Sequence, residues 1–425
     1  MFRKGRKVTL GSLVIFLALL VVHKQQGVRT QDQWVFKPFR QLKETVIYKD
    51  ASPMNISHNV TTMQLMYQRR DKLPGFKELL RLVQNRKPQV TLQINGTSIV
   101  EDGLFWSHDV EEEIFADDSD RDIDGEISFM QRSVIAGITD QYVGGKGSNY
   151  LVYLKDGTKL FARHRTKCLA IAEIATFHMS RLLGMNIVPT SILTLANPTV
   201  PQWNDPKVRL RLRSVGLHGD DHVTLSLWMN NFSENVSFPH ILLRGDKKIH
   251  IQNAMLREMT SQEVAYLAQW TDLVLLDFIT LHTDRVTRAL RTLDGAIKDP
   301  WLLNVKVKNL IRKGRKLWLI DNEATATFSS KITPLTRDLL YHLRLLDSTC
   351  VFRRSTVERM LWLRYYGNAS ASLMTVILDA EPFIKADDIR NCKNDLPFVL
   401  DARIDIIFRH IVSCLHEAQV TFVNN

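Results

Sequence analysis

The pattern of apolar and polar positions predicts a mixture of strands and helices from residue 76 onward. Apolar residues recur with a period near 3.6 in helices and alternate in half-buried strands. In chain order, the pattern predicts a helix at 76–83, strands at 91–107, 150–154 and 159–163, a helix at 168–183, strands at 185–196 and 208–213, and a long helix from residue 261. Helices dominate the C-terminal part, so an α+β fold is expected.

Local turn and capping signals fix several of these elements. Asp156-Gly157 between two alternating runs is typical of a β-hairpin. Gly184 ends the helix at 168–183. Thr260 and Glu263 form a capping box that opens the long helix. A second hairpin is expected from residues 302–320, with its turn near residues 312–315.

The N-terminus carries a short apolar run behind a basic cluster. Residues 3–7 hold four basic side chains, and the run extends from Val8 to Val22. Positive charge before the run predicts type II topology, with residues 1–7 cytosolic and the rest luminal. Fifteen helical residues span roughly 22 Å, which favours a thin Golgi bilayer. We expect a signal-anchor at 8–24 and a luminal stem at 25–90; a cleaved signal peptide is the alternative.

Glycosylation sequons and cysteines agree with a luminal location. Asn-x-Ser/Thr triplets begin at Asn55, Asn59, Asn95, Asn231, Asn235 and Asn368, and they predict exposed loops. In an oxidising compartment the four cysteines, Cys168, Cys350, Cys392 and Cys414, are expected to form two disulfides. Three pairings are possible, and the sequence leaves them open.

Charge is distributed unevenly along the 425 residues. The formal net charge is +11, but residues 109–126 hold ten acids against one arginine, so the remainder carries about +20. A basic surface suits anionic partners without choosing among them. No nucleic-acid partner is predicted.

The acidic window contains a calcium-like spacing. Asp120, Asp122 and Asp124 occupy positions one, three and five of a loop with Gly125 at position six, as in an EF-hand. Gln131 stands where a bidentate Glu is wanted, so a solvated acidic loop is the alternative. Asp122 and Asp124 also form the D-x-D of a metal-dependent glycosyltransferase.

Two later aspartates have the order expected of a phosphotransferase. The long helix leads into Asp284, and a strand leads into Asp321. Protein kinases place a catalytic base and a metal ligand in this way. No His-Arg-Asp or Asp-Phe-Gly is present, so the prediction depends on the surrounding residues.

Residues expected to hold nucleotide phosphates lie upstream. Gly145, Lys146 and Gly147 precede the first hairpin strand and would bring backbone amides and a cation to phosphate oxygens. Arg163 on the returning strand and Glu173 on the next helix match a phosphate-positioning ion pair. Kinases generally use Lys at the strand position, and His164 and Arg165 are alternatives to Arg163.

Several blocks together resemble the four-jointed family over roughly residues 95–415. They are Val100-Glu-Asp-Gly-Leu-Phe-Trp-Ser107, Glu173 followed by Ser180-Arg-Leu-Leu-Gly184, Gln269 to Thr280 running into Asp284-Arg285, Asp321-Asn322-Glu323 and Cys350-Val-Phe-Arg353. The resemblance implies an atypical protein-kinase-like fold at 91–425, with a small β-rich lobe and a larger helical lobe behind the anchor.

The resemblance also implies an activity. It implies a Golgi Ser/Thr kinase, single-pass type II with a luminal domain, using ATP with Mn²⁺ or Mg²⁺. The implied substrates are extracellular cadherin domains of Fat and Dachsous type proteins, with planar polarity and growth as consequences, and a secreted form after stem cleavage is expected. By position, Asp284 is the base, Asp321 the main metal ligand, and Glu173 orients Arg163 or contacts metal.

One departure leaves two other functions open. Ala289 occupies the position where kinases carry an Asn ligand for the second metal, and alanine cannot coordinate. Unless Asn322 or Glu323 substitutes, activity is expected to be low or lost. The alternatives are a non-catalytic nucleotide-binding protein on the same fold and, from the D-x-D, a Golgi glycosyltransferase.

Overall fold

We describe a computed structural model of the chain. The residues that it describes are 76–115, 121–139, 148–234, 236–243, 248–251, 253–296, 306–324, 337–364, 368–392 and 396–423. All of these residues belong to one compact unit. The predicted cytosolic tail and anchor lie outside the described residues. Among the helices that are described, none is long and apolar enough to cross a membrane.

A five-stranded antiparallel sheet carries one half of the candidate site. Its strands are β4 (Ile135–Ile138), β5 (Ser148–Leu154), β6 (Lys159–His164), β7 (Ser191–Leu195) and β8 (His222–Leu227), in the order β4-β5-β6-β8-β7. The predicted hairpin is confirmed as β5 and β6, which pair Tyr150 with Ala162. Of the predicted strand at 185–196, only its second half is a strand.

The helix α6 (Lys167–Leu182) packs against strands β7 and β8 of this sheet. Most of its residues are buried, which explains why its apolar positions are not confined to one stripe. It ends as predicted at Gly184, whose φ of 67° lies in the left-handed region. A Cβ at Gly184 would lie 2.6 Å from Nε of Arg359, so glycine is also required by space.

The predicted strand at 208–213 is wrong, because these residues form helix α7 (Pro206–Ser214). Asp205 caps the helix by accepting from the backbone N–H of Lys207, and Pro206 occupies the first turn, where proline is favoured. Val208 and Leu212 are buried four residues apart, while Leu210 is 81% exposed. The sequence alternates as a strand would, but its buried positions have the spacing of a helix, and Leu210 faces outward.

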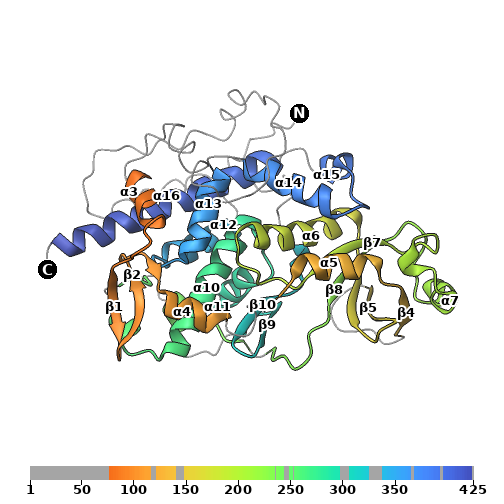
Figure 1. Ribbon diagram of the computed structural model, residues 1–425, viewed down its shortest axis with the longest axis horizontal. Helices are drawn as coiled ribbons and strands as arrows, with labels where there is room; N and C mark the ends of the chain where they lie inside the picture. Colours follow the sequence, from red (N-terminus) through yellow and green to blue (C-terminus); the bar gives the residue numbers. More distant parts are fainter. Residues whose placement is uncertain are drawn as a thin grey trace, which may run out of the picture. The chain divides into compact units, whose positions relative to one another are not determined.

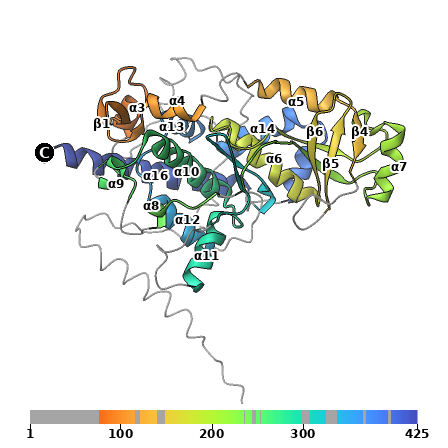
Figure 2. The same cartoon turned by 90° about the horizontal axis from the view of Figure 1, so that it is seen from below.

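Helices make up most of the rest. α10 (Ser261–Thr280) begins with the predicted Thr260–Glu263 capping box and is buried along most of its length. It packs against α4, α12 and α16. Figure 1 and Figure 2 both show these helices to one side of the five-stranded sheet. The other bounds are α4 (His108–Phe115), α5 (Ile123–Arg132), η2 (Pro201–Trp203), α8 (His240–Leu243), α9 (Ala254–Arg257), α11 (Val286–Ala296), α12 (Arg337–Asp347), α13 (Arg354–Trp362), α14 (Ala369–Ala380), α15 (Ala386–Cys392) and α16 (Leu396–Val423).

The core extends further toward the N-terminus than predicted. Helix α3 (Phe76–Val83) packs on α13 and α16, and Phe76 lies 6.2 Å from Phe408 between ring centroids. A three-stranded sheet follows, made of β1 (Val90–Ile94), β2 (Thr97–Glu101) and β3 (Phe105–Trp106). Residues 76–83, which lie in the predicted stem, thus pack as part of the folded core.

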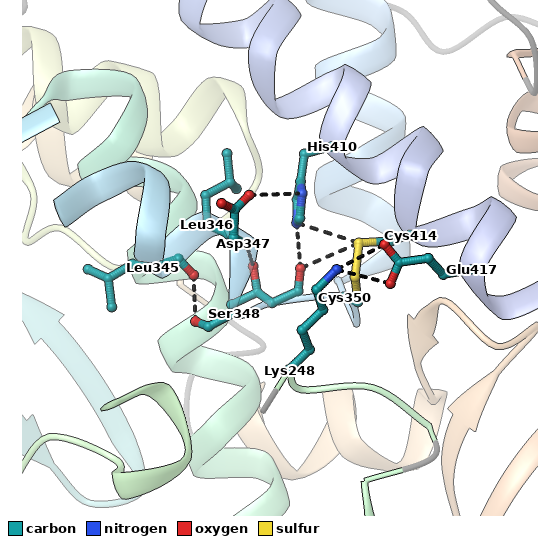
Figure 3. The surroundings of a disulfide bond; sticks show 10 residues. Lys248, Leu345, Leu346, Asp347, Ser348, Cys350, His410, Cys414 and Glu417 are labelled. Atoms are coloured by element: carbon teal, nitrogen blue, oxygen red, sulfur yellow. Dashed lines mark hydrogen bonds and ion pairs between the residues drawn. A yellow bond between two sulfur atoms is a disulfide. The ribbon is translucent and has the colours of Figure 1, made fainter. Parts of the chain in front are cut away.

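Two disulfides form, as predicted, and the structure settles their pairing. Cys168 joins Cys392 across 224 residues, and Cys350 joins Cys414 across 64. Figure 3 shows the second bridge beside His410, whose Nε2 lies 3.5 Å from Cys414 Sγ. These three residues have metal-like spacing. Both sulfurs are bonded to each other, however, so they offer no thiolate.

The described sequons fit the glycosylation prediction in two cases. Asn95, in the β1–β2 turn, and Asn231 are exposed. Asn368 differs, because its side-chain oxygen accepts from the backbone N–H of Ala371 and caps α14. Asn55, Asn59 and Asn235 lie outside the described residues.

Candidate functional site

A short hairpin delivers Asp321 next to the five-stranded sheet. β9 (Leu310–Lys313) pairs with β10 (Lys316–Leu319), and the short helix η4 (Asn322–Ala324) follows. The predicted hairpin is thus present, with its first strand starting at residue 310. Asp321 has a φ of 56°, a left-handed conformation that Asp tolerates better than most side chains. The backbone changes direction sharply at Asp321, between β10 and η4. Sparsely populated backbone conformations of this kind are common at functional sites.

Three side chains from three elements form a continuous ion-pair chain. Arg163 on β6 donates from Nη1 to Glu173 Oε1 at 2.9 Å. Its Nη2 lies 2.7 Å from Asp321 Oδ1. Arg163 and Glu173 are both about 5% exposed, whereas Asp321 is 29% exposed. The structure thus brings together three residues predicted from sequence, with Asp321 at the accessible end.

The environment holds Arg163 as a cation. Burial disfavours the charged guanidinium, but attraction from Glu173 and Asp321 outweighs it, so the pKa of Arg163 is raised. The second oxygen of Glu173 accepts from the hydroxyl of Thr224 on β8 at 2.9 Å. Glu173 is therefore fixed on both oxygens, which orients Arg163 toward Asp321.

The alternative cation, Arg165, has a separate partner. It forms an ion pair with Glu323, one residue beyond Asn322 in η4. Burial raises the pKa of Glu323, and the guanidinium groups of Arg165 and Arg163 oppose that shift. His164 instead lies 3.3 Å from Asp221. Of the three basic residues considered from sequence, Arg163 is the one paired with Glu173.

The second aspartate follows the end of α10. Leu281 caps the helix in the left-handed conformation, and His282 then returns toward the Asp321 loop. The ring Nε2 of His282 lies 3.0 Å from the backbone oxygen of Asp321. Burial holds the pKa of His282 well below its usual value, so the ring is neutral. His282 was not predicted from the sequence, although its place two positions before Asp284 was a signal for it.

Arg285 connects the loop that carries Asp284 to the loop that carries Asp321. Its side chain is fully buried and forms an ion pair with Asp277 on α10. It also donates to the backbone oxygens of Asn309 and Ile320 and, at 2.6 Å, to Oδ1 of Asn322. A planar guanidinium can satisfy several acceptors at fixed angles. This buried cation and His282 therefore both connect the two loops.

Asp284 itself is more accessible than Asp321. Its side chain is 38% exposed, Oδ1 lies 2.5 Å from Nη1 of Arg288, and Oδ2 lies 3.4 Å from the amide nitrogen of Asn309. Asn309 precedes β9 and has a φ of 59°. It was missed from sequence because 25 residues separate it from Asp284, and only the folded chain brings them together.

The donor set around Asp321 fits a hard divalent cation. Mg²⁺ and Mn²⁺ prefer carboxylate oxygens, which Asp321 and Glu323 carry. Glu173 fits less well, because Arg163 and Thr224 already engage both of its oxygens. Asn322 fits less well, because its Oδ1 accepts from Arg285 and its amide donates to Leu319. Its observed role is to hold Arg285. Ala289 is buried in the core, so this position offers no ligand.

The remaining predicted site residues lie elsewhere. Gly145, Lys146, Gly147 and Asp120 are outside the described residues. Asp122 is the N-cap of α5 and accepts from the backbone N–H of Gly125, while Asp124 pairs with Arg181 at 2.5 Å. The predicted calcium loop and its acidic-loop alternative are wrong from residue 123 onward, because an α-helix replaces the loop. The D-x-D aspartates therefore have structural partners.

Comparison with known proteins agrees with the resemblance in the sequence. The family described as Four-jointed box protein middle domain matches residues 122–417. Four-jointed box protein 1 of Xiphophorus maculatus is 27% identical over 319 residues, which cover 74% of this chain and 71% of the relative. The Drosophila melanogaster protein named Extracellular serine/threonine protein kinase four-jointed is 27% identical over 270 residues, covering 52% and 46%.

Solved structures give a weaker comparison. The crystal structure of the Golgi casein kinase aligns with 87% of this chain and 94% of its own at 14% identity, with a TM-score of 0.44. The family match covers well over half of the sequence and includes Glu173, Asp284 and Asp321, and the chain therefore belongs to the four-jointed family.

Proposed function

We propose that this chain is a luminal Golgi protein kinase that transfers the γ-phosphate of ATP to Ser or Thr. The observation that carries the proposal is the chain from Glu173 through Arg163 to Asp321, joined to the Asp284 loop by Arg285 and His282. A cation fixed by a helix carboxylate, a metal-binding aspartate and a second aspartate for the acceptor are what phosphoryl transfer requires. The name of the Drosophila relative is consistent with this activity.

Each residue has a defined task in the proposed reaction. Asp284 accepts the proton of the attacking hydroxyl, whose oxygen forms a bond to the γ-phosphorus while the bond to the β–γ bridging oxygen breaks and ADP leaves. Arg163, held by Glu173, supplies fixed positive charge near the phosphates. Asp321, with Glu323, would hold Mn²⁺ or Mg²⁺, which neutralises developing charge on the phosphate oxygens.

The proposed acceptors are extracellular cadherin domains of Fat and Dachsous type proteins, and the location is the Golgi membrane with a luminal catalytic domain. Family membership supports both proposals, and the predicted anchor and the sequons in the sequence support the location. The two disulfides are consistent with an oxidising compartment. We propose the planar-polarity role and a secreted form after stem cleavage on the same basis.

A second candidate is a nucleotide-binding protein without turnover. Two observations favour it: Ala289 is buried, and Asn322 is committed to Arg285. The site then lacks the amide that kinases use for a second metal ion. A glycosyltransferase is not proposed, because Asp122 caps helix α5 and Asp124 pairs with Arg181.

The test uses the full chain purified from a secretory host, labelled ATP, Mn²⁺ and a cadherin-repeat acceptor. Transfer to Ser or Thr that is abolished by Asp321→Ala would support the kinase. An Asp122→Ala variant is the matched control, and it should retain transfer. ATP binding without transfer would replace the kinase with the nucleotide-binding protein.

A further inference from the structure

The proposed base has an accessible cationic neighbour. Nη1 of Arg288 lies 2.5 Å from Oδ1 of Asp284, and the two side chains are 47% and 38% exposed. One turn further along α11, Arg291 is also exposed and donates to the backbone oxygen of Thr283 at 2.8 Å. Residues three apart on a helix lie on the same face. One guanidinium group is therefore paired with the Asp284 side chain, and a second lies at the backbone of the preceding residue.

Two other nearby arginines are held by buried carboxylates. Arg285 is fully buried against Asp277, and Arg163 is fixed between Glu173 and Asp321. Neither can turn toward an acceptor without leaving a buried carboxylate unpaired, which is costly. Arg288, by contrast, belongs to an exposed ion pair, which contributes only about 0–1 kcal/mol and exchanges partners easily.

This contact has a consequence for the acceptor. A hydroxyl that gives its proton to Asp284 needs a carboxylate oxygen, but Arg288 holds Oδ1 and Asn309 approaches Oδ2. An acceptor carboxylate can take Arg288 away from Asp284, because it replaces one ion pair with another. A lysine or arginine in the same place would instead be repelled by Arg288 and Arg291.

We propose that Arg288 and Arg291 form a subsite for a carboxylate on the acceptor polypeptide. In this arrangement Arg288 moves from Asp284 to the acceptor carboxylate when the acceptor binds, which frees Oδ1 for the hydroxyl proton. The substrate class is then a Ser or Thr segment with Asp or Glu close to the phosphorylated residue. This inference rests on the proposed kinase activity for its meaning, but the subsite can be measured by binding alone.

The deciding experiment is fluorescence anisotropy with the full chain at low ionic strength. One labelled peptide carries Ser flanked by Asp and Glu, and its twin carries Asn and Gln instead. We expect wild type to bind the acidic peptide about 10-fold more tightly. The preference should fall to about 2-fold or less in Arg288→Gln and be reduced in Arg291→Gln. Arg209→Gln, which removes an exposed charge from α7, should leave it unchanged.

The outcomes separate this subsite from the activity. Equal binding of the two peptides by wild type, or an acidic preference that survives in Arg288→Gln, would overturn the subsite. An equal loss in Arg209→Gln would also overturn it, because overall charge would then explain the binding. An acidic preference that depends on Arg288, without phosphate transfer to either peptide, would support the subsite while the proposed kinase fails.

Discussion

Two buried carboxylates near α6 have different partners, one an arginine and the other a histidine. Glu173 is 4% exposed and forms an ion pair with Arg163 at 2.9 Å. Glu381, which follows α14, is fully buried and has the ring of His178 at 3.4 Å and the backbone N–H of Leu193 at 2.8 Å. Burial raises the pKa of Glu381 to about 8 and lowers that of His178 to about 3, so this pair is neutral near pH 7.

The comparison shows that the partner decides whether a buried acid is charged. A guanidinium stays protonated at any ordinary pH, so a carboxylate beside it can remain ionised. Imidazole loses its proton easily when buried, and the carboxylate beside it then keeps its own. Glu173 therefore holds the Arg163 cation at the candidate phosphate site, whereas Glu381 supports packing between α6 and β7.

The largest effect is expected from Glu173→Gln. This change keeps shape but removes the charge that orients Arg163, so we expect transfer to Ser or Thr to fall about 100-fold or more. It also leaves Arg163 with a single carboxylate, and we expect the free energy of unfolding to fall by roughly 3 kcal/mol. Radiolabel transfer and urea denaturation measure the two effects. Transfer at the wild-type rate would show that Arg163 does not need Glu173.

Glu381→Gln should change pH dependence instead of transfer. In the folded chain Glu381 holds its proton up to about pH 8, whereas in the unfolded chain it ionises near 4.5. The contribution of Glu381 to the free energy of unfolding is thus complete below pH 4.5 and is lost as the pH rises toward 8. The pKa of His178 is lowered in the folded chain, so its dependence has the opposite sign. Its contribution to the free energy of unfolding is lost as the pH falls below 6.5.

Of this pair, only Glu381 therefore makes the free energy of unfolding depend on pH between pH 6.5 and 8. We expect wild type to lose about 2 kcal/mol of its free energy of unfolding across that window, at 1.36 kcal/mol per pH unit. Glu381→Gln should lose about 2 kcal/mol less. Denaturation at both pH values with the two proteins measures the difference, and parallel pH profiles would contradict the neutral pair.

Arg163→Lys tests whether the guanidinium is needed or only its charge. Lys offers one ammonium, which cannot hold Glu173 and Asp321 with the same fixed fork. We expect transfer to fall about 10-fold, with the loss mainly in kcat. Because Lys is the residue that kinases generally use at this position, an unchanged or higher rate would indicate that the site tolerates either cation.

The smallest effect is expected from Asn309→Ala. The amide contact to Asp284 is long, at 3.4 Å, so its loss should lower kcat by about 3-fold with little change in KM. The backbone oxygen of Asn309, which accepts from Arg285, remains. A matched variant, Asn95→Ala in the exposed β1–β2 turn, should have no effect on either constant. A KM effect alone would assign Asn309 to binding.

Much of the local structure was predictable from neighbouring residues. The β5–β6 hairpin follows from Asp156-Gly157, the start of α10 from its capping box, and the end of α6 from Gly184. These signals depend on backbone chemistry within a few residues. Two local predictions failed: the strand at 208–213, where alternation and a helical spacing coincide, and the loop from residue 123, where Asp122 caps a helix.

The sequence by itself determined which residues could carry the chemistry, since charge type and order singled out Glu173, Asp284 and Asp321. Only the tertiary structure decided their distant partners: Arg163 over Arg165, Asn309 at Asp284, and Arg285 across both loops. The physical reason is distance along the chain. Ion pairs between residues 10 to 158 positions apart depend on how strands and helices pack, and no local pattern encodes that packing.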